Sequence, residues 1–230
     1  LGIIEDPVSI ENIEKNIVER AFKEGWIKPQ PPKYRTDKTI AVIGSGPAGL
    51  AAAQQLNRAG HTVTVFERDD EVGGLLRYGI PNFKMEKGII DRRIAILKAE
   101  GIIFKTNINV GVNYDVKDLK NFDSIVLCGG STESRSLPTP GIDADGVVQA
   151  MKFLKQQTKV LFGKEVKDQI IATDKDVIVI GGGDTGSDCI GTSNRHGAKS
   201  VVNFEIMPKP PGHRSPTTPW PFWPLQLKTS

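Results

Sequence analysis

Gly44, Gly46 and Gly49 form a GxGxxG pattern directly after a continuous apolar run, residues 40–43. Such a run predicts a parallel strand that is buried on both faces, and the Ala- and Leu-rich residues 47–59 predict a helix. In this arrangement the first glycine permits a tight turn, the second lets a pyrophosphate approach the backbone, and the third lets the helix pack close to the strand. Free N–H groups and the positive dipole end at the start of the helix also favour a phosphate.

An acidic residue follows this unit at the end of a second apolar run. Residues 63–66 predict a second buried strand, and Glu67 comes next, where an acid accepts hydrogen bonds from a ribose hydroxyl. Strand, helix, strand and acid together predict a dinucleotide site rather than a merely structural unit of the same shape. The candidate residues of this unit are Gly44, Ser45, Gly46, Pro47, Ala48, Gly49, Glu67 and Arg68.

Two further pairs of glycines lie downstream. The Gly73–Gly74 pair lets the backbone pass close to a flat or anionic group, so its loop either covers a bound flavin, which we favour, or is a plain glycine turn; Leu75 joins the candidates. Residues 123–128 predict another buried strand, which Gly129 and Gly130 follow. Because ligands bind at the carboxyl ends of parallel strands, both of these glycines are candidate site residues.

The opening pattern returns later in the chain as an internal repeat. Gly181, Gly183 and Gly186 again follow an apolar run, and Glu205 again ends the next one. The repeat predicts a second dinucleotide site, the alternative being a duplicated unit in which one site is dead. Its candidate residues are Gly181, Gly182, Gly183, Asp184, Thr185, Gly186 and Glu205.

Composition excludes several functional classes. The 230 residues are 38% hydrophobic and 25% charged with a net charge of +3, which gives no reason to expect nucleic acid or a membrane surface as a partner. No apolar run approaches the roughly 20 residues of a membrane span.

Cys128 and Cys189 are expected to be buried thiols rather than a disulfide, and without a CxxC motif neither a metal site nor a redox dithiol is predicted. His61 and His196 adjoin helix-ending glycines, so we expect no catalytic residue among them.

These patterns predict an α/β fold with two Rossmann-like βαβ dinucleotide-binding domains of the two-domain flavoprotein type, the second truncated. We expect a lead-in over residues 1–37, an FAD-binding domain over 38–148 and an NAD(P)H-binding domain over 149–230. Within the lead-in we expect a helix that is capped by Ser9 or Asn12, followed by a proline-rich extended linker. Further expected elements are helices over 85–99 and 150–157, a strand over 102–105 and a helical turn at 118–119. A first residue that is not Met and a Pro/Trp-rich end predict that the sequence is part of a longer chain.

Two adjacent dinucleotide sites suit a protein in which electrons pass between the ligands. A flavin accepts hydride from a nicotinamide and releases electrons singly. The protein has to stack two rings and exclude water, which needs no acid–base pair.

The two glycine patterns, VGGLLRYGIPNFKMEKGIIDRR, VVNFEIMPKPPGHR and PWPFWP together resemble the FAD- and pyridine-nucleotide-binding region of glutamate synthase. That region is a small (beta) subunit in bacteria or the C-terminal part of a fused chain. The resemblance implies that the first unit binds FAD and the second NADH or NADPH. It also implies that electrons pass through 4Fe–4S clusters, which this chain does not ligate, to a large (alpha) subunit or fused synthase domain that makes glutamate from 2-oxoglutarate and glutamine.

The resemblance further implies a cytoplasmic protein, or one in a plastid or other organelle if the source is eukaryotic. The returning FAD segment of the family would lie beyond Ser230, so we expect the chain alone to bind FAD poorly and to be inactive. Glu205 favours the free ribose hydroxyl of NADH over the 2′-phosphate of NADPH. The alternatives are the same module feeding another reductase, as in dihydropyrimidine dehydrogenase, and a non-catalytic nucleotide-binding domain.

Overall fold

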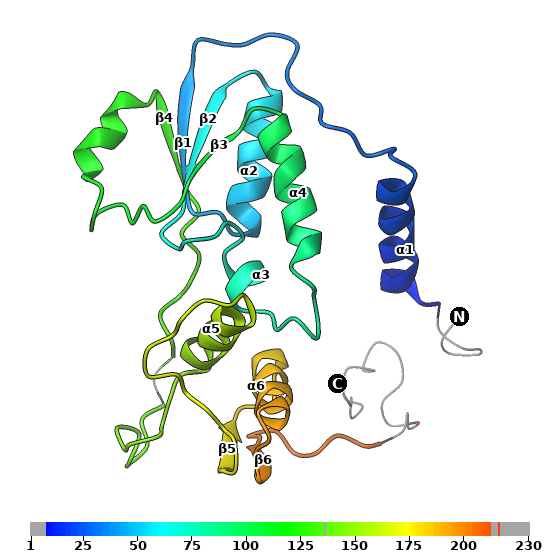
Figure 1. Ribbon diagram of the computed structural model, residues 1–230, viewed down its shortest axis with the longest axis vertical. Coiled ribbons are helices and arrows are strands. Elements are labelled where there is room, and N and C mark those ends of the chain that lie inside the picture. Colours follow the sequence, from blue (N-terminus) through cyan, green and yellow to red (C-terminus); the bar gives the residue numbers. More distant parts are fainter. Residues whose placement is uncertain (1–7, 136, 213–215, 217–230) are drawn as a thin grey trace.

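The computed structural model describes residues 8–135, 137–212 and 216, which form two separate parallel sheets (Figure 1). The first has four strands in the order β3-β2-β1-β4, and the second pairs β5 with β6. The strands are β1 Thr39–Ile43, β2 Thr62–Phe66, β3 Ile103–Lys105, β4 Ser124–Leu127, β5 Asp176–Ile180 and β6 Ser200–Phe204. The helices are α1 Ile10–Lys23, α2 Pro47–Arg58, α3 Leu75–Tyr78, α4 Gly88–Ala99, the 3-10 helix η1 Val116–Asn121, α5 Ala150–Leu161 and α6 Asp184–Arg195.

The first sheet has its main core between β1, β2 and the helices α2 and α4. Val42 and Val65 face each other in the parallel register of β1 and β2, and both are fully buried. Leu50 of α2 and Leu97 of α4 belong to the same core cluster, and the two helices lie side by side along the sheet (Figure 1). The central strands are therefore buried as the apolar runs predict.

The second sheet is covered on one face. Phe153 of α5 and Cys189 of α6 pack with Val179 of β5 into a second core cluster. On the opposite face Ile180 of β5 and Phe204 of β6 are exposed. Among the described residues, α5 and α6 therefore form the only helical layer on this sheet.

The lead-in segment is tied to the first sheet's helices by charged contacts. The guanidinium of Arg92 on α4 is paired with Glu19 of α1 and lies 4.1 Å from the centroid of the Phe22 ring. Further along, the Gln30 N–H donates to Oε1 of the buried Glu100 at 3.1 Å. The proline-rich segment is extended as predicted, and it is also pinned to the domain.

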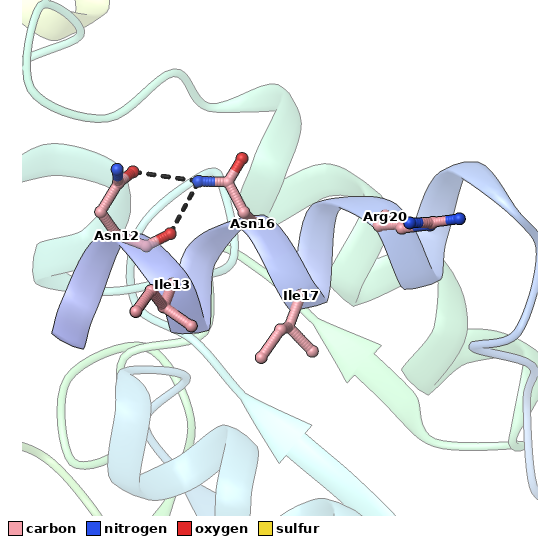
Figure 2. Close-up of a pocket in the computed structure, with 5 residues that line it drawn as sticks. All are labelled: Asn12, Ile13, Asn16, Ile17 and Arg20. Atoms are coloured by element: carbon pink, nitrogen blue, oxygen red, sulfur yellow. Dashed lines mark hydrogen bonds between the residues drawn. The ribbon is translucent and has the colours of Figure 1, made fainter. Parts of the chain in front are cut away.

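The N-terminal capping prediction for α1 is confirmed for the position of the cap but not for its hydrogen bond. Ser9 stands at the N-cap position, but its side chain makes no capping hydrogen bond. The Asn12 side chain bonds one turn onward with Asn16 instead (Figure 2). The shallow hollow that Figure 2 shows is lined only by α1 residues, among them Ile13 and Ile17, so it encloses no ligand site.

A strand forms within residues 123–128 as predicted, but the prediction that it is buried is wrong. β4 forms and pairs in parallel with β1, but Ile125 is 45% exposed and Leu127 79% exposed. β4 is the edge strand of its sheet, and an apolar run by itself cannot distinguish an edge strand from a central one.

Smaller differences concern element ends. α4 begins at Gly88 instead of residue 85, and β3 begins at Ile103 instead of residue 102. α5 continues to Leu161, beyond residue 157, and the turn expected at 118–119 is the longer 3-10 helix η1. No helix among the described residues is long and apolar enough to cross a bilayer.

Candidate functional site

The three glycines of the first turn differ in what a side chain at each position would meet. Gly44 has φ +103°, and a Cβ there would lie 2.3 Å from the Cys128 carbonyl oxygen. A Cβ on Gly49 would lie 1.9 Å from the Gly44 carbonyl oxygen, so α2 packs directly on the turn. A Cβ on Gly46, in contrast, would meet nothing within 4 Å. Gly44 and Gly49 are thus required by the fold, whereas Gly46 leaves open space at the start of α2.

The carboxylate of Glu67 is buried beside this turn, with 4% of the residue exposed. Its Oε2 accepts hydrogen bonds from the Ser45 N–H, at 3.1 Å, and from the Ser45 hydroxyl. Its Oε1 accepts from the Asp69 N–H at 2.8 Å, and the Ser45 hydroxyl oxygen accepts from the Gly73 N–H at 3.0 Å. The acid, the turn and the following loop are therefore one hydrogen-bonded unit.

The loop with the glycine pair passes over the start of α2. Gly74 has φ +56°, and a Cβ there would lie 2.8 Å from the Gly46 Cα. The loop therefore packs closely on the Gly46 backbone, while the position of a Gly46 Cβ itself stays open. Leu75 follows at the start of α3 and is 48% exposed.

The remaining first-unit candidates surround the turn. Pro47 and Ala48 form the exposed first turn of α2. Gly129 and Gly130 follow β4, and a Cβ on either would meet nothing within 4 Å. Arg68 is exposed and reaches over to donate to the Thr132 hydroxyl at 3.4 Å. All the first-unit candidates therefore gather at the carboxyl edge of one sheet.

The second glycine turn repeats the first. Gly181 has φ +117°, and a Cβ on Gly186 would lie 2.1 Å from the Gly181 carbonyl oxygen. A Cβ on Gly183 would meet nothing within 4 Å, as at the equivalent position of the first turn. Asp184 and Thr185 form the exposed first turn of α6. The second site therefore has the same backbone construction, but it is more open to solvent.

Glu205 lies over the second turn. A Cβ on Gly182 would lie 1.4 Å from the Glu205 Oε2, so the carboxylate occupies the space above that glycine. The Glu205 Oε1 accepts from the Met207 N–H at 3.2 Å. Gly182 is the counterpart of Ser45, so an acid faces the same residue of the turn in both units, by hydrogen bonds in one and by close contact in the other.

The cysteines and His196 are the remaining reactive side chains that the sequence singled out. Among the described residues no group of His, Cys, Asp and Glu side chains could hold a metal ion. Both cysteines are free thiols, and burial, with the nearby charge of Asp188, raises the pKa of Cys189 to about 11. His196 is half-buried at the end of α6, where the Ala172 N–H donates to its Nδ1 at 3.3 Å and its Nε2 lies 2.6 Å from the Gln157 Oε1.

The sequence reasoning missed the residues that hold Glu67 in place. Asp69 donates through its backbone, and its side chain pairs with Lys155 of α5. The signal that could have found this contact is the acidic run of residues 69–71, together with Lys155 and Lys159 one helical turn apart.

Two parallel βαβ units, each with a glycine turn at the carboxyl edge of its sheet, define a Rossmann-type α/β protein with two dinucleotide-type turns. Residues 38–216 match the family described as pyridine nucleotide-disulphide oxidoreductase. The chain belongs to this oxidoreductase family.

Relatives that are more than 50% identical to the chain are named glutamate synthase or its small chain. The chain is 55% identical, over its whole length, to the glutamate synthase (NADPH) small chain of Mycobacterium tuberculosis, of which it spans 48%. It is 55% identical over 99% of its length to the glutamate synthase (NADH) of Saccharomyces cerevisiae, of which it spans 11%. The small chain of Bacillus subtilis is 52% identical. The chain thus spans about half of the bacterial relatives and a much smaller share of the yeast one.

Solved structures share the fold at low identity. FprA of Mycobacterium tuberculosis in complex with NADPH superposes with a TM-score of 0.61 at 22% identity, covering 73% of this chain and 43% of that one. 2-Naphthoyl-CoA reductase superposes with a TM-score of 0.55 at 26% identity, covering 76% of this chain and 24% of that one.

Proposed function

We propose that this chain is the electron-input module of a glutamate synthase, in which a hydride passes from NADH or NADPH to FAD. The observation that carries the proposal is the repeated turn, in which Gly49 and Gly186 pack the helix on the turn while Gly46 and Gly183 leave open space. A pyrophosphate binds at the N-terminus of a helix where no side chain keeps it away from the backbone N–H groups.

The first turn fits FAD. The start of α2 offers open space at Gly46 and a helix N-terminus, and Glu67 holds a buried carboxylate at the end of β2. Ser45 and Gly73 tie that acid to the loop above it. The residues that would hold FAD are Gly44, Ser45, Gly46, Pro47, Ala48, Gly49, Glu67, Arg68, Gly73, Gly74, Leu75, Gly129 and Gly130.

The second turn fits a nicotinamide dinucleotide, with NADH preferred. Gly183 leaves open space at the start of α6, and the Glu205 carboxylate stands where a ribose hydroxyl can donate to it. A 2′-phosphate at that place would meet a like charge. The residues that would hold the coenzyme are Gly181, Gly182, Gly183, Asp184, Thr185, Gly186 and Glu205.

FAD, when bound, supplies a two-electron acceptor that can release electrons singly. The chain's own residues bind the two phosphate groups, fix the acids beside each ribose and hold the two units against each other. No side chain has to move a proton for this step, so we assign none as catalytic.

The relatives' names support the wider assignment. In a glutamate synthase the electrons would pass from FAD through 4Fe–4S clusters to a large subunit or fused synthase domain, where glutamine and 2-oxoglutarate give glutamate. Those clusters would lie outside this chain, which has two cysteines. We place the complete protein in the cytoplasm, and we propose the lead-in at 1–37, the FAD domain at 38–148 and the NAD(P)H domain at 149–230, with the two separate sheets as support.

The test uses the complete protein that carries this chain, assembled with its synthase part. We expect oxidation of NADH that depends on both glutamine and 2-oxoglutarate, with a higher kcat/KM than for NADPH. A separately produced chain of residues 1–230 should hold little flavin and should not oxidise either coenzyme. Coenzyme oxidation that is independent of the two substrates, with another acceptor required, would contradict the glutamate synthase assignment.

A further inference from the structure

An acidic loop from the first unit, Asp69 to Glu71, lies against lysines of the second unit. Lys155 of α5 is paired with Asp69. Lys164, just beyond α5, has its Nζ 2.5 Å from the Asp70 Oδ2 and 3.5 Å from the Glu71 Oε1. Figure 1 shows α5 directly beside α3, below the first sheet. The loop that leaves the first dinucleotide turn is therefore held by the other unit.

Tyr78 of α3 also takes part in this contact. Its hydroxyl donates to the Asp70 Oδ1 at 2.5 Å, and only 2% of the residue is exposed. The Nζ atoms of Lys155 and Lys159 each lie 5.4 Å from the centroid of its ring. Burial opposes the ionisation of Asp70, but hydrogen bonds from Lys164 and Tyr78 outweigh it and hold the pKa of Asp70 well below its usual range. The contact therefore stays ionic near neutral pH.

A second contact joins the two units at α6. The Lys84 Nζ lies 2.5 Å from the Asp188 Oδ1. The Arg195 guanidinium carbon lies 3.7 Å from the centroid of the Phe83 ring, and a Cβ on Gly191 would lie 2.6 Å from that ring. Two separate contacts on different helices restrict rotation of one unit against the other.

The acidic loop also reaches the first site directly. Asp69 pairs with Lys155 through its side chain, while its N–H donates to the Glu67 Oε1 at 2.8 Å. The Glu67 Oε2 accepts from the Ser45 N–H of the glycine turn at 3.1 Å. A lysine of the second unit is thus linked through one residue to the acid of the first.

We propose that the acidic loop and Lys155, Lys159 and Lys164 form an inter-unit clamp that sets the orientation of the two dinucleotide sites. Lys155 is a positioning residue, because it acts on Glu67 only through Asp69. This inference rests on the proposed function, because hydride transfer requires the two bound rings at near-attack distance.

The contact itself is tested without any cofactor chemistry. A carbodiimide joins a lysine to a carboxylate with no spacer, so in the complete protein it should link residues 69–71 to Lys155, Lys159 or Lys164, as peptide mass spectrometry detects. The yield should fall at high salt, because ions screen partly exposed pairs. Absence of these links at low salt would overturn the clamp, whether or not the protein binds flavin.

The positioning role is tested by charge exchange. In the complete protein Lys155→Glu should slow flavin reduction at saturating coenzyme about tenfold, which corresponds to about 1.4 kcal/mol. Asp69→Lys should do the same, and the double variant should recover most of the rate. Lys167→Glu is the matched control, because Lys167 is an exposed lysine near α5 outside the clamp.

The outcomes separate the clamp from the proposed function. If the wild-type protein gives the cross-links but its flavin is not reduced by the coenzyme, the contact between the units is confirmed and the proposed hydride transfer is refuted. Single variants that reduce flavin at the wild-type rate, or a double variant no better than the singles, overturn the positioning role. If a single variant fails to fold, recovery of a folded, active double variant still supports the charge pairing, and its failure to fold counts against it.

Discussion

Replacing the glycines of the first turn with alanine should separate what the fold needs from what the ligand needs. A Cβ on Gly49 would lie 1.9 Å from the Gly44 carbonyl oxygen. Ordinary contact distances are about 3.5 Å, so α2 would have to move outward by roughly 1.5 Å. The position of the Cβ is fixed by the α2 backbone and the oxygen belongs to the backbone of the turn, so neither group can rotate away. A Cβ on Gly46 would meet nothing within 4 Å, and its φ of −66° suits alanine.

We therefore expect Gly49→Ala to lower the free energy of unfolding by about 1–3 kcal/mol, as overpacking does. The melting temperature would fall by roughly 3–10 °C. Gly46→Ala should cost at most about 1 kcal/mol as a changed N-cap, yet it should remove bound FAD, because its methyl group fills the phosphate approach.

The assay is thermal unfolding without added FAD, together with flavin content after purification, for both variants of the complete protein. Gly183→Ala and Gly186→Ala provide the matched pair in the second unit, where FAD content should stay normal and coenzyme binding should fail in Gly183→Ala. A Gly46→Ala protein with full flavin content would show that the phosphate does not approach at Gly46, and a Gly49→Ala protein as stable as the parent would show that α2 does not depend on this close contact.

Three further predictions concern single residues. Glu100→Ala should lower the free energy of unfolding by about 3–5 kcal/mol in denaturant titrations, because it removes a fully buried carboxylate that pairs with Arg58; Glu100→Gln should lose less, and equal losses would argue against the ion pair. Burial lowers the pKa of His196, so its contribution to stability should be complete above pH ~6.5 and be lost as the pH falls below that value; unfolding curves of His196→Gln should lack this part of the acid sensitivity. Glu205→Ser should weaken NADH binding about 10- to 100-fold, the worth of a hydrogen bond to a charged group, while an unchanged dissociation constant would remove Glu205 from the site.

Both glycine turns could be predicted from the sequence because their requirements are local. Gly49 and Gly186 are glycines because each packs on a carbonyl oxygen five residues earlier, and such constraints leave a fixed spacing in the chain. The apolar runs likewise predicted β1 and β2, since burial on both faces needs continuous apolar residues.

Long-range contacts could not be predicted in the same way. The exposure of Leu127 depends on which strand becomes the sheet edge. The partners of Glu67 include Asp69, whose orientation depends on Lys155, far along the chain. The acidic run of residues 69–71 and the lysines of α5 are visible in the sequence, but nothing there says that they pair, so the contact between the two units appears only in three dimensions.

The two turns are proposed to bind an FAD and a nicotinamide coenzyme that exchange a hydride. Anaerobic mixing of the complete protein with NADH in a stopped-flow instrument follows that transfer itself. We expect one tightly bound FAD per complete chain, bleached in a single turnover, with a rate that falls in the Lys155→Glu variant. A complete protein that purifies without FAD, or whose FAD keeps its oxidised spectrum with both NADH and NADPH, would contradict this proposal.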